Sequence, residues 1–528
     1  MISIKKFLKS ILVAGISTLT TVSSFSSVEA SGEKIIFIPH DSRPISNKQS
    51  AEVVQKLGYE VVTPPIELLG NEKNFGEPDK LWEWLEQNAD GAVTAVISSD
   101  AMLYGSLVAS RKHSIDEKTI ANRIENFEKI HEKFPYLKMF TFASIMRTPR
   151  TGEGVGSEET DYYKQYGASI FQYTSLLDKK ETEKLTKQEK KSLKNLENSI
   201  PKEALEDWMK RRSKNFNANK KLVDLTRKDV FGYFLLGRDD NAPYSQTHME
   251  GRHLKEYAKD LGKTRMQTVA GIDELALLML TRAVNTITGD VPFVYTQYNI
   301  GTGAKTIPAY SDETIEQSIQ EAIISTGGYP VLKPDNANVV LLVNTNIDGA
   351  TYESLNAVPG NYGQIRPGTI EFADMVSENV GKGYPVAIAD IAFANGSDNA
   401  LMNQLRDRAL LFKIRAYGGW NTPTNSTGFV LGTAMLATRM NYWDVDDLLI
   451  TRYLDDWAYQ SNVRRIVLNQ MNGFRYPKAS ITDIESQIEA RSTKLLNRFI
   501  EDNLPPFDFG DVRVVFPWHR MFESDVLR

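Results

Sequence analysis

Short apolar runs alternate with amphipathic stretches through the first 300 residues of the chain. The runs 34–38, 92–97 and 138–145 are continuous, whereas intervening segments such as 47–57 space their apolar residues for one helix face. Continuous apolar strands are buried on both faces, and strands that alternate with helices pair in parallel. The pattern therefore predicts an α/β fold with a predominantly parallel sheet.

The stretch 157–228 interrupts this alternation. It is charged and helical in its spacing, with Lys and Glu densest at 179–194, so it is interpreted as a helical insertion. Charges of both signs on such a helix are typical of a solvated face rather than of a binding surface. The strand pattern resumes at 230–236 and continues at 268–272 and 292–296.

The domain boundaries follow from these changes of pattern. All strands up to residue 296 are assigned to a first α/β domain at 31–300, and a second, smaller α/β unit follows at 301–439. Residues 440–528 are mainly helical in pattern. Seven or eight strands suit either an open Rossmann-like sheet or a barrel-like one, so both remain open for the first domain.

The first thirty residues have the pattern of a secretory signal peptide. Three lysines precede an apolar run at 11–16, and residues 28–30 have the small-x-small form that signal peptidase cuts. Cleavage near Ala30 predicts a secreted or extracytoplasmic protein that does not associate with a membrane afterwards. A membrane anchor is the alternative, but the apolar run is too short to span about 30 Å of hydrocarbon.

Composition narrows the range of partners. The apolar fraction of 41% is ample for packed cores, and 62 basic against 67 acidic residues leave a formal charge of only −5. This balance provides no basic footprint for nucleic acid or for an anionic membrane surface. Because the chain has no cysteine, disulfides, thiolate metal ligands and cysteine nucleophiles are excluded.

Polar residues follow nearly every predicted strand. Because the carboxyl ends of parallel strands meet at one edge of a sheet, such residues can line a single ligand crevice. Several carboxyl groups at one crevice satisfy the two-carboxylate requirement of glycoside hydrolysis. The acidic residues at these strand ends are Asp41, Asp100, Asp239, Asp240, Asp273, Glu274 and Asp390.

Asp239 and Asp240 are the leading candidates for acid/base chemistry. The alternatives are ligation of a hard cation, an Asx-type turn or a helix cap. Side chains of adjacent residues point in different directions, so we expect at most one of the two to face the crevice. The second catalytic carboxylate is expected to be Asp41, Asp100 or Asp390. Six scattered histidines and no cysteines do not favour a metal site, and no cofactor is expected.

Three arginines at strand ends are candidates for binding an anionic group. Arg43 follows Asp41 by two residues on a proline-bounded loop, where its guanidinium fork can bind a carboxylate, phosphate or sulfate. The alternative is an internal Asp–Arg pair that stiffens the loop. Arg147 and Arg238 follow two further strands, so an anionic glycan is among the expected ligands.

The segment 417–422 is the most informative local signal. Gly418 and Gly419 permit a backbone path that other residues cannot follow, which can bring the main chain close to a ligand. The alternative is a buried turn whose amides bond to backbone. Nearby amide groups and aromatic rings are suited to hydrogen-bond to sugars or to stack on them. These residues are Tyr104, Asn395, Trp420, Asn421 and Asn425.

Five segments form a recognisable combination. They are 39–44 (Pro-His-Asp-Ser-Arg-Pro), 238–240 (Arg-Asp-Asp), Asp390 with Asn395 and Gly396, 417–422 with Asn425 and Gly428, and 455–460 (Asp-Asp-Trp-Ala-Tyr-Gln). Together they resemble the bacterial family catalogued as domain of unknown function 4127. The resemblance covers essentially the whole mature chain, and its specific parts are the Asp-x-Arg-Pro and Gly-Trp-Asn-Thr segments. It implies a shared architecture and no catalytic assignment.

These features support two hypotheses of different class. The first is a secreted hydrolase, with a glycoside hydrolase acting on a polar or anionic glycan as the favoured kind. The second is a non-catalytic extracytoplasmic binding protein for a small polar ligand. A carboxylate pair across one crevice favours the enzyme, whereas acids all paired with arginines favour binding or a structural role. Either hypothesis requires the segment 390–425 to lie within a side chain's reach of Asp41 and Asp240. The sequence does not define an oligomeric state.

Overall fold

The computed structural model describes residues 32–152, 156–471, 478–504 and 512–528. The predicted signal peptide at 1–30 lies outside these residues. Within the described ranges, no helix is both long enough and apolar enough to cross a membrane.

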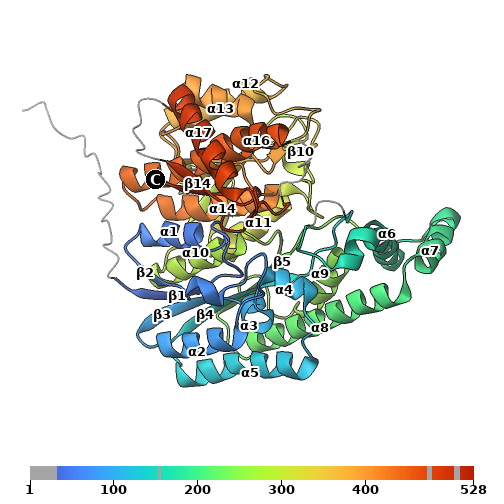
Figure 1. Cartoon of the computed structure of the whole chain (residues 1–528). Helices are drawn as coiled ribbons and strands as arrows, with labels where there is room; N and C mark the ends of the chain where they lie inside the picture. The colour runs from blue at the N-terminus through green and yellow to red at the C-terminus, as the bar shows by residue number, and fades with distance from the viewer. Residues whose placement is uncertain (1–31, 153–155, 472–477, 505–511) are drawn as a thin grey trace, which may run out of the picture.

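The first half of the chain forms an open sheet of six parallel strands (Figure 1). The strands lie in the order β2-β1-β3-β4-β5-β6, with β2 and β6 at free edges, so the sheet is open and not a barrel. From β1 the chain turns to β2 on one side and later to β3 on the other, which makes the gap between β1 and β3 a topological switch point. The strands are β1 (Lys34–Ile38), β2 (Glu60–Val62), β3 (Ala92–Ser98), β4 (Lys138–Ile145), β5 (Tyr233–Arg238) and β6 (Met266–Ala270).

Helices cover both faces of this sheet, as the continuous apolar strands predicted. Ile35 and Phe37 of β1 belong to one core cluster, and Ile36 and Ile38 belong to the cluster on the opposite face. Figure 1 shows α1 and α10 on the first face and α2, α5 and α8 on the second. The helices are α1 (Lys48–Gln55), α2 (Pro78–Asn88), α3 (Ser99–Tyr104), α4 (Leu107–Lys112), α5 (Glu117–Lys133), α9 (Gln246–Tyr257) and α10 (Leu275–Thr288), with a short 3-10 helix, η1 (Ile66–Leu68).

Three helices between β4 and β5 form the helical insertion that the sequence predicted. They are α6 (Asp161–Thr182), α7 (Lys187–Ser199) and α8 (Lys202–Arg227). α6 and α7 project from the body of the molecule in Figure 1, and α7 has no buried residue. Its Lys and Glu side chains are therefore solvated, as expected for a charged helix.

The second half contains a five-stranded parallel sheet in the order β13-β11-β9-β7-β8. Counted from β7, this order repeats that of the first five strands of the first sheet, so each half is doubly wound with its own switch point. Assigning the strand at 292–296 to the first sheet was wrong, because β7 pairs with β8 and β9. The strands are β7 (Phe293–Tyr298), β8 (Tyr329–Val331), β9 (Val339–Asn344), β11 (Val386–Asp390) and β13 (Ala416–Gly418).

The rest of the second half and the C-terminal region are mainly helical. The helices are α11 (Ile315–Ser325), α12 (Thr369–Gly381), α13 (Asn399–Asp407), α14 (Pro423–Ala437), α15 (Tyr442–Arg452), the π-helix η4 (Tyr453–Val463), α16 (Arg464–Gln470) and α17 (Glu485–Asn503), with two short 3-10 helices, η2 (Gly303–Lys305) and η3 (Pro334–Asn336). Two small two-stranded sheets complete the chain: β10 (Tyr352–Glu353) with β12 (Phe393–Ala394), and β14 (Arg513–Val515) with β15 (Asp525–Leu527).

The two halves are joined where α10 packs on α14. α10 leads from the first sheet to the second, and every residue of α14 is buried. Gly428 and Gly432, one turn apart on α14, face α10 so closely that an added Cβ would lie 2.4 Å from Glu274 Cγ at the first position and 2.9 Å from Leu277 Cγ at the second. One continuous apolar cluster includes Phe37 of the first sheet and Val340 of the second. The halves therefore pack as one body, not as two lobes separated by solvent.

The glycine contact predicts a specific sensitivity to added volume. Gly428→Ala is expected to lower the free energy of unfolding by about 1–3 kcal/mol, because the new methyl group overlaps the stem of Glu274. Gly381→Ala is the matched control, since Gly381 ends α12 facing open space and alanine is the better helix former. Urea unfolding of both variants measures the difference. Equal stability of Gly428→Ala and wild type would mean that the helices do not approach closely at this residue.

Candidate functional site

A cavity of about 870 Å³ lies where the carboxyl ends of the two sheets meet. This cavity, called the crevice below, has the location expected for a ligand site in doubly wound folds. The first half lines it with residues that follow β1, β4, β5 and β6, namely Arg43, Arg147, Asp239, Asp240 and Asp273. The second half contributes residues at or after β10, β12 and β13, including Glu353, Asn395, Asn421 and Asn425.

Arg43 binds two carboxylates from separate strand ends. Its guanidinium contacts Asp41 at 2.8 Å and Asp273 at 2.7 Å, and its NH2 group lies 2.9 Å from His40 Nε2. Although burial raises the pKa of Asp273, Arg43 and His40 together hold it well below the usual value. The loop after β1 is therefore tied to the loop after β6 by a buried ion pair.

The second half reaches this ion pair directly. The side-chain amide of Asn421 donates a hydrogen bond to Asp273, and Asn425 Oδ1 accepts one from the backbone amide of Ile272 at 2.8 Å. The segment after β13 thus contacts Asp273, which also binds Arg43, and its Asn421 borders the same cavity as Asp240. Trp420 and the glycines before it are not part of that contact.

Asp239 and Asp240 both border the crevice, so the expectation that at most one would face it was wrong. Asp240 has a positive φ of 27°, which breaks the usual alternation of side chains at the end of β5. Asp239 accepts hydrogen bonds from Arg111 at 2.6 and 3.1 Å, and Asp240 lies 3.1 Å from Arg147. Burial raises the pKa of Asp239, with Arg111 opposing and Asp240 adding to the shift.

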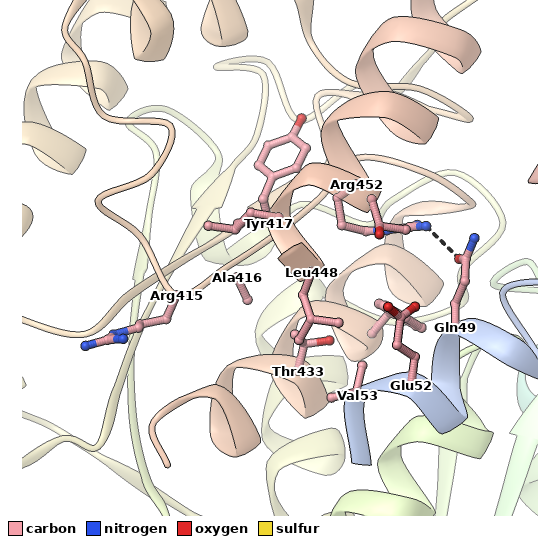
Figure 2. Close-up of a pocket in the computed structure, with 12 residues that line it drawn as sticks. Gln49, Glu52, Val53, Arg415, Ala416, Tyr417, Thr433, Leu448 and Arg452 are labelled. Atoms are coloured by element: carbon pink, nitrogen blue, oxygen red, sulfur yellow. Dashed lines mark hydrogen bonds between the residues drawn. The ribbon is translucent and has the colours of Figure 1, made fainter. Parts of the chain in front are cut away.

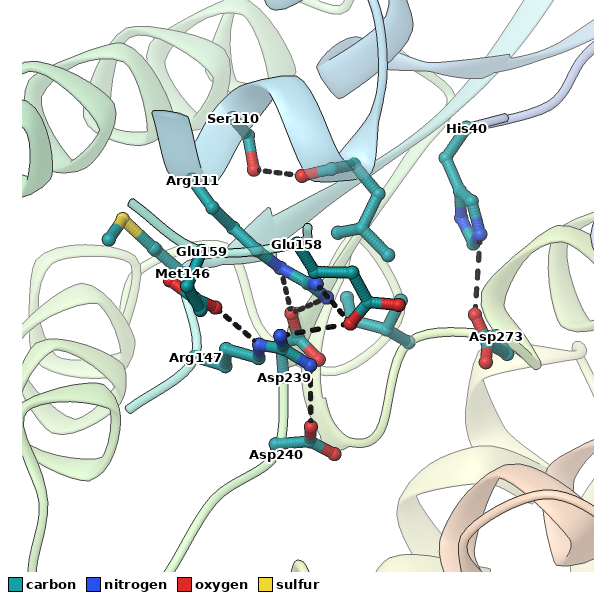
Figure 3. A network of polar contacts seen from close by, with 12 residues as sticks. His40, Ser110, Arg111, Met146, Arg147, Glu158, Glu159, Asp239, Asp240 and Asp273 are labelled. Carbon is teal, nitrogen blue, oxygen red and sulfur yellow. Dashed lines mark hydrogen bonds and ion pairs between the residues drawn. The ribbon is translucent and has the colours of Figure 1, made fainter. Parts of the chain in front are cut away.

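A buried network of acids and arginines continues from this pair (Figure 3). Arg147 contacts Glu159 at 2.6 Å as well as Glu158 and Asp240. Glu158 is surrounded by four cations, which hold its pKa well below the usual value despite its burial. The cations are Arg111 at 3.2 Å, Arg147 at 2.9 Å, Lys478 at 3.1 Å and Arg520 at 2.7 Å.

Glu353, which borders the crevice from the second half, is bound by neutral donors. Tyr310 donates a hydrogen bond from its hydroxyl at 2.5 Å, and Asn395 donates one from Nδ2 at 2.9 Å. Among the described residues, no cation forms an ion pair with Glu353. Tyr310 and Asn395 both have positive φ angles, of 67° and 60°, and both border the crevice.

Three carboxylates expected at the site do not line the crevice. Asp41 is fully buried behind Arg43. Asp100 is buried in the first turn of α3, where burial raises its pKa to about 6. Asp390 accepts hydrogen bonds from Tyr417 at 2.7 Å and Asn344 at 2.9 Å, and burial together with Asp398 raises its pKa to about 7. These acids stabilise the loops around the crevice instead of facing it.

Three of the expected binding residues are also placed elsewhere. Tyr104 stacks on His113 with ring centroids 4.6 Å apart, and Trp420 packs on Phe522 at 5.5 Å. Arg238 pairs with Asp312 at 3.0 Å and with Glu313 at 2.5 Å. All three side chains pack or pair inside the protein, and none of them borders the crevice.

The glycine pair before Trp420 serves a contact inside the protein, not a ligand. An added Cβ at Gly419 would lie 2.8 Å from Ser397 Cα, and one at Gly418 would lie 2.7 Å from Val430 Cγ2. Asp456, on the π-helix η4, accepts hydrogen bonds from the backbone amides of Gly419 at 2.8 Å and Trp420 at 3.3 Å. The glycines therefore let the chain turn tightly so that Asn421 reaches Asp273.

The structure also reveals crevice residues that the sequence did not single out: Arg111, Glu158, Tyr310, Glu353, Arg464, Lys478 and Phe522. Most of them do not directly follow a strand of the two large sheets, so the pattern of polar residues at strand ends could not identify them. Glu353 could not be recognised as a strand-end residue, because β10 has only two residues and no apolar run. Within the described part of the chain, no group of three or more His, Asp or Glu side chains is arranged to hold a metal ion.

A second cavity, between α1, α14 and α15, is too small for a ligand (Figure 2). Its volume is about 10 Å³, roughly the space of one water molecule. Arg452 crosses it to donate a hydrogen bond to Gln49 at 2.6 Å, which connects the C-terminal region to α1. The large crevice is therefore the candidate functional site.

The fold and the crevice define a protein with two doubly wound α/β halves and one polar cavity at their shared carboxyl edge. The chain belongs to the family described as protein of unknown function (DUF4127), which matches residues 35–527. A comparison with curated proteins finds no match.

The buried position of Arg43 predicts a large effect on stability. Arg43→Met is expected to lower the free energy of unfolding by about 3–5 kcal/mol, because it leaves Asp41 and Asp273 buried without their cation. Arg498→Met, which removes an exposed pair with Asp502 on α17, is the control and should have no measurable effect. Chemical unfolding at neutral pH compares them. If the Arg43→Met protein were as stable as the control, Arg43 would not be needed to compensate the two buried carboxylates.

The same pair predicts a dependence on pH. Because the pKa of Asp273 is lowered in the folded protein, its stabilising contribution is present above the unfolded pKa of about 3.9 and is lost as the pH falls below it. The stability difference between wild type and Arg43→Met should therefore shrink in acid. A difference that stays constant from neutral pH down to about pH 2 would refute this linkage.

Proposed function

We propose that the crevice is the active site of a secreted hydrolase that cleaves a glycosidic bond in a polar or anionic glycan. Its volume of about 870 Å³ falls within the range of about 300–1,000 Å³ typical of small-molecule sites. Its walls combine carboxylates, arginines and amides, which suit a ligand with many hydroxyl groups and a negative charge.

One observation carries the proposal: Asp240 and Glu353, from opposite halves, border the same cavity and are the acids least engaged by cations. Among the described residues, Arg147 is the only cation that pairs with Asp240, through Oδ2, and the Asp240 side chain is 27% exposed. Glu353 is held by Tyr310 and Asn395, which are neutral. The other acids at the crevice each form close ion pairs with arginines. Asp240 and Glu353 are therefore the carboxyl groups free to exchange protons with a ligand.

The reaction needs two carboxyl groups with opposite tasks. One donates a proton to the glycosidic oxygen as the carbon–oxygen bond breaks, and the other accepts a proton from the water that attacks the anomeric carbon. The products are a free reducing end and an alcohol, and the two carboxyl groups exchange their protonation states. Solvent restores them before the next cycle. Asp240 and Glu353 fill these two tasks, one from each half of the chain.

Backbone strain supports a functional role for this part of the crevice. Asp240, Tyr310 and Asn395 all have positive φ angles and all border the cavity. Non-glycine residues in this region of conformational space are disfavoured, and they persist chiefly where function requires their geometry. The three residues are one member of the proposed carboxyl pair, Asp240, and the two hydrogen-bond donors of the other, Glu353.

The alternative is a non-catalytic binding protein for a small polar ligand. It is favoured by the pairing of Asp41, Asp239, Asp273 and Glu158 with arginines, which removes these acids from proton transfer. The continuous core between the halves argues against binding by hinge closure, since opening a hinge would expose apolar surface. A binding protein of this fold would therefore use a preformed crevice.

The proposal predicts that Asp240→Asn and Glu353→Gln each lower turnover by about 10²–10⁴-fold without changing the melting temperature. Asp229→Asn is the matched control, because Asp229 also has a positive φ but is exposed and does not border the crevice. The measurement is reducing-end release from a glycan library by the purified mature protein, with chelator and added divalent cations as further controls. Full activity of Asp240→Asn would remove Asp240 from the mechanism.

Glycan binding without any reducing-end release by wild type would instead favour the binding protein. If hydrolysis is found, an activated aryl glycoside tells the two tasks apart. The variant that lacks the proton donor should still cleave it, since the leaving group no longer needs a proton. Loss of activity on both substrates identifies the residue that activates water.

A further inference from the structure

Arg464 is a buried arginine without a counter-ion in the wall of the crevice. It begins α16 directly after η4, borders the cavity and is fully buried. Its NH2 group donates a hydrogen bond to the carbonyl oxygen of Asn395 at 2.7 Å, but Nε and NH1 have no hydrogen-bond partner in the part of the chain that the structure describes. It forms no ion pair with any residue in the ranges that the structure describes.

The other buried arginines of the crevice make this absence informative. Arg43, Arg111 and Arg147 each contact at least one carboxylate within about 3 Å, as buried guanidinium groups require. Burial lowers the pKa of Arg464 to about 10, which is the opposite of the shift at Arg43 and Arg147. A buried cation with two free donors is unfavourable unless an anion pairs with it.

A second cation, Lys478, contacts the same aromatic ring as Arg464. Arg464 Cζ is 5.6 Å and Lys478 Nζ is 4.7 Å from the centre of the Phe522 ring, and both residues border the crevice. The only close acid of Lys478 among the described residues is Glu158, which three arginines share. An anion in the crevice would therefore meet two cations whose charges the described acids do not fully pair.

We propose that Arg464 and Lys478 form an oxyanion subsite that binds a carboxylate, sulfate or phosphate group of the ligand. The guanidinium fork matches two oxygens of such a group, and the ammonium adds a point charge. Asn395 Oδ1, which is buried without a partner beside Arg464, is an acceptor for a neighbouring hydroxyl of the same ligand. The identification of the anion as a group of the glycan substrate rests on the proposed function. Anion binding itself does not, because it does not require hydrolysis.

The test measures anion binding by the full mature chain at constant ionic strength. Binding is detected as a rise in the thermal unfolding midpoint, and calorimetry gives the affinity. The probes are sodium sulfate, inorganic phosphate and glucuronate, with sodium chloride and glucose as controls. At least one oxyanion probe should raise the midpoint of wild type, and Arg464→Met should weaken its binding about tenfold or more. Without anion, Arg464→Met should be at least as stable as wild type, because it removes an uncompensated buried charge.

Arg465→Met is the matched control. Arg465 is the next residue, is also buried with a free Nε, but lies over the Tyr362 ring and does not border the crevice. It should bind the probes like wild type, and Lys478→Met should bind them more weakly than wild type. Equal affinity of Arg464→Met and wild type, or no binding of any oxyanion by wild type, would overturn the subsite.

The preferred probe identifies the source of the charge. Tighter binding of glucuronate points to a uronate, and tighter binding of sulfate or phosphate points to an ester group on the glycan. Anion binding that depends on Arg464 in a protein without hydrolase activity would refute the proposed function and leave the subsite standing. If hydrolysis depends on Asp240 but Arg464→Met binds every probe like wild type, the proposed function stands and the subsite is refuted.

Discussion

The close contact of α10 with α14 is the constraint on which the crevice depends. α10 lies on the first sheet and α14 on the second, and they approach closely because Gly428 and Gly432 have no side chains. This contact fixes how the carboxyl edges of the two sheets face each other. Residues that follow strands of either half can then border one cavity, although the two sheets share no strand.

Electrostatics explains much of the remaining geometry. A buried ion pair contributes little net stability compared with apolar packing. Loss of one partner, however, strongly destabilises the fold, because the other charge is left buried and unpaired, so such pairs hold residues in defined positions. Arg43 holds the loops after β1 and β6 together, and Arg147 does the same for residues after β4 and β5. The crevice is therefore surrounded by charges whose places are fixed by one another. Arg464 is a buried exception, since it forms no ion pair with any of the residues described.

Much of this arrangement could be predicted from the sequence. Continuous apolar runs identified the parallel strands, and polar residues at their carboxyl ends identified Arg43, Arg147, Asp240 and Asn421 as neighbours of one cavity. Those signals depend only on strand burial and chain direction, which local sequence determines. The sheet that β7 joins could not be predicted, because a buried strand looks the same in either sheet.

Side-chain direction and remote partners limited the prediction of the site. Asp390 and Trp420 follow strands as expected but point into the protein, where Tyr417 and Phe522 contact them. Glu353 and Arg464 border the crevice from a two-residue strand and from a helix in the C-terminal region. Neither position has a local pattern, since both result from packing between distant segments.

The π-helix η4 has a consequence for how this site could change during evolution. Its 11 residues, wound more widely than an α-helix, end directly before Arg464. If the same residues were rewound as α-helix, every later residue would turn about the axis, because each residue of an α-helix turns the chain further than a residue of a π-helix. Arg464 would leave the crevice while both sheets kept their strands. The charge at this wall can therefore be gained or lost through a change of helix register, without any substitution at the arginine itself.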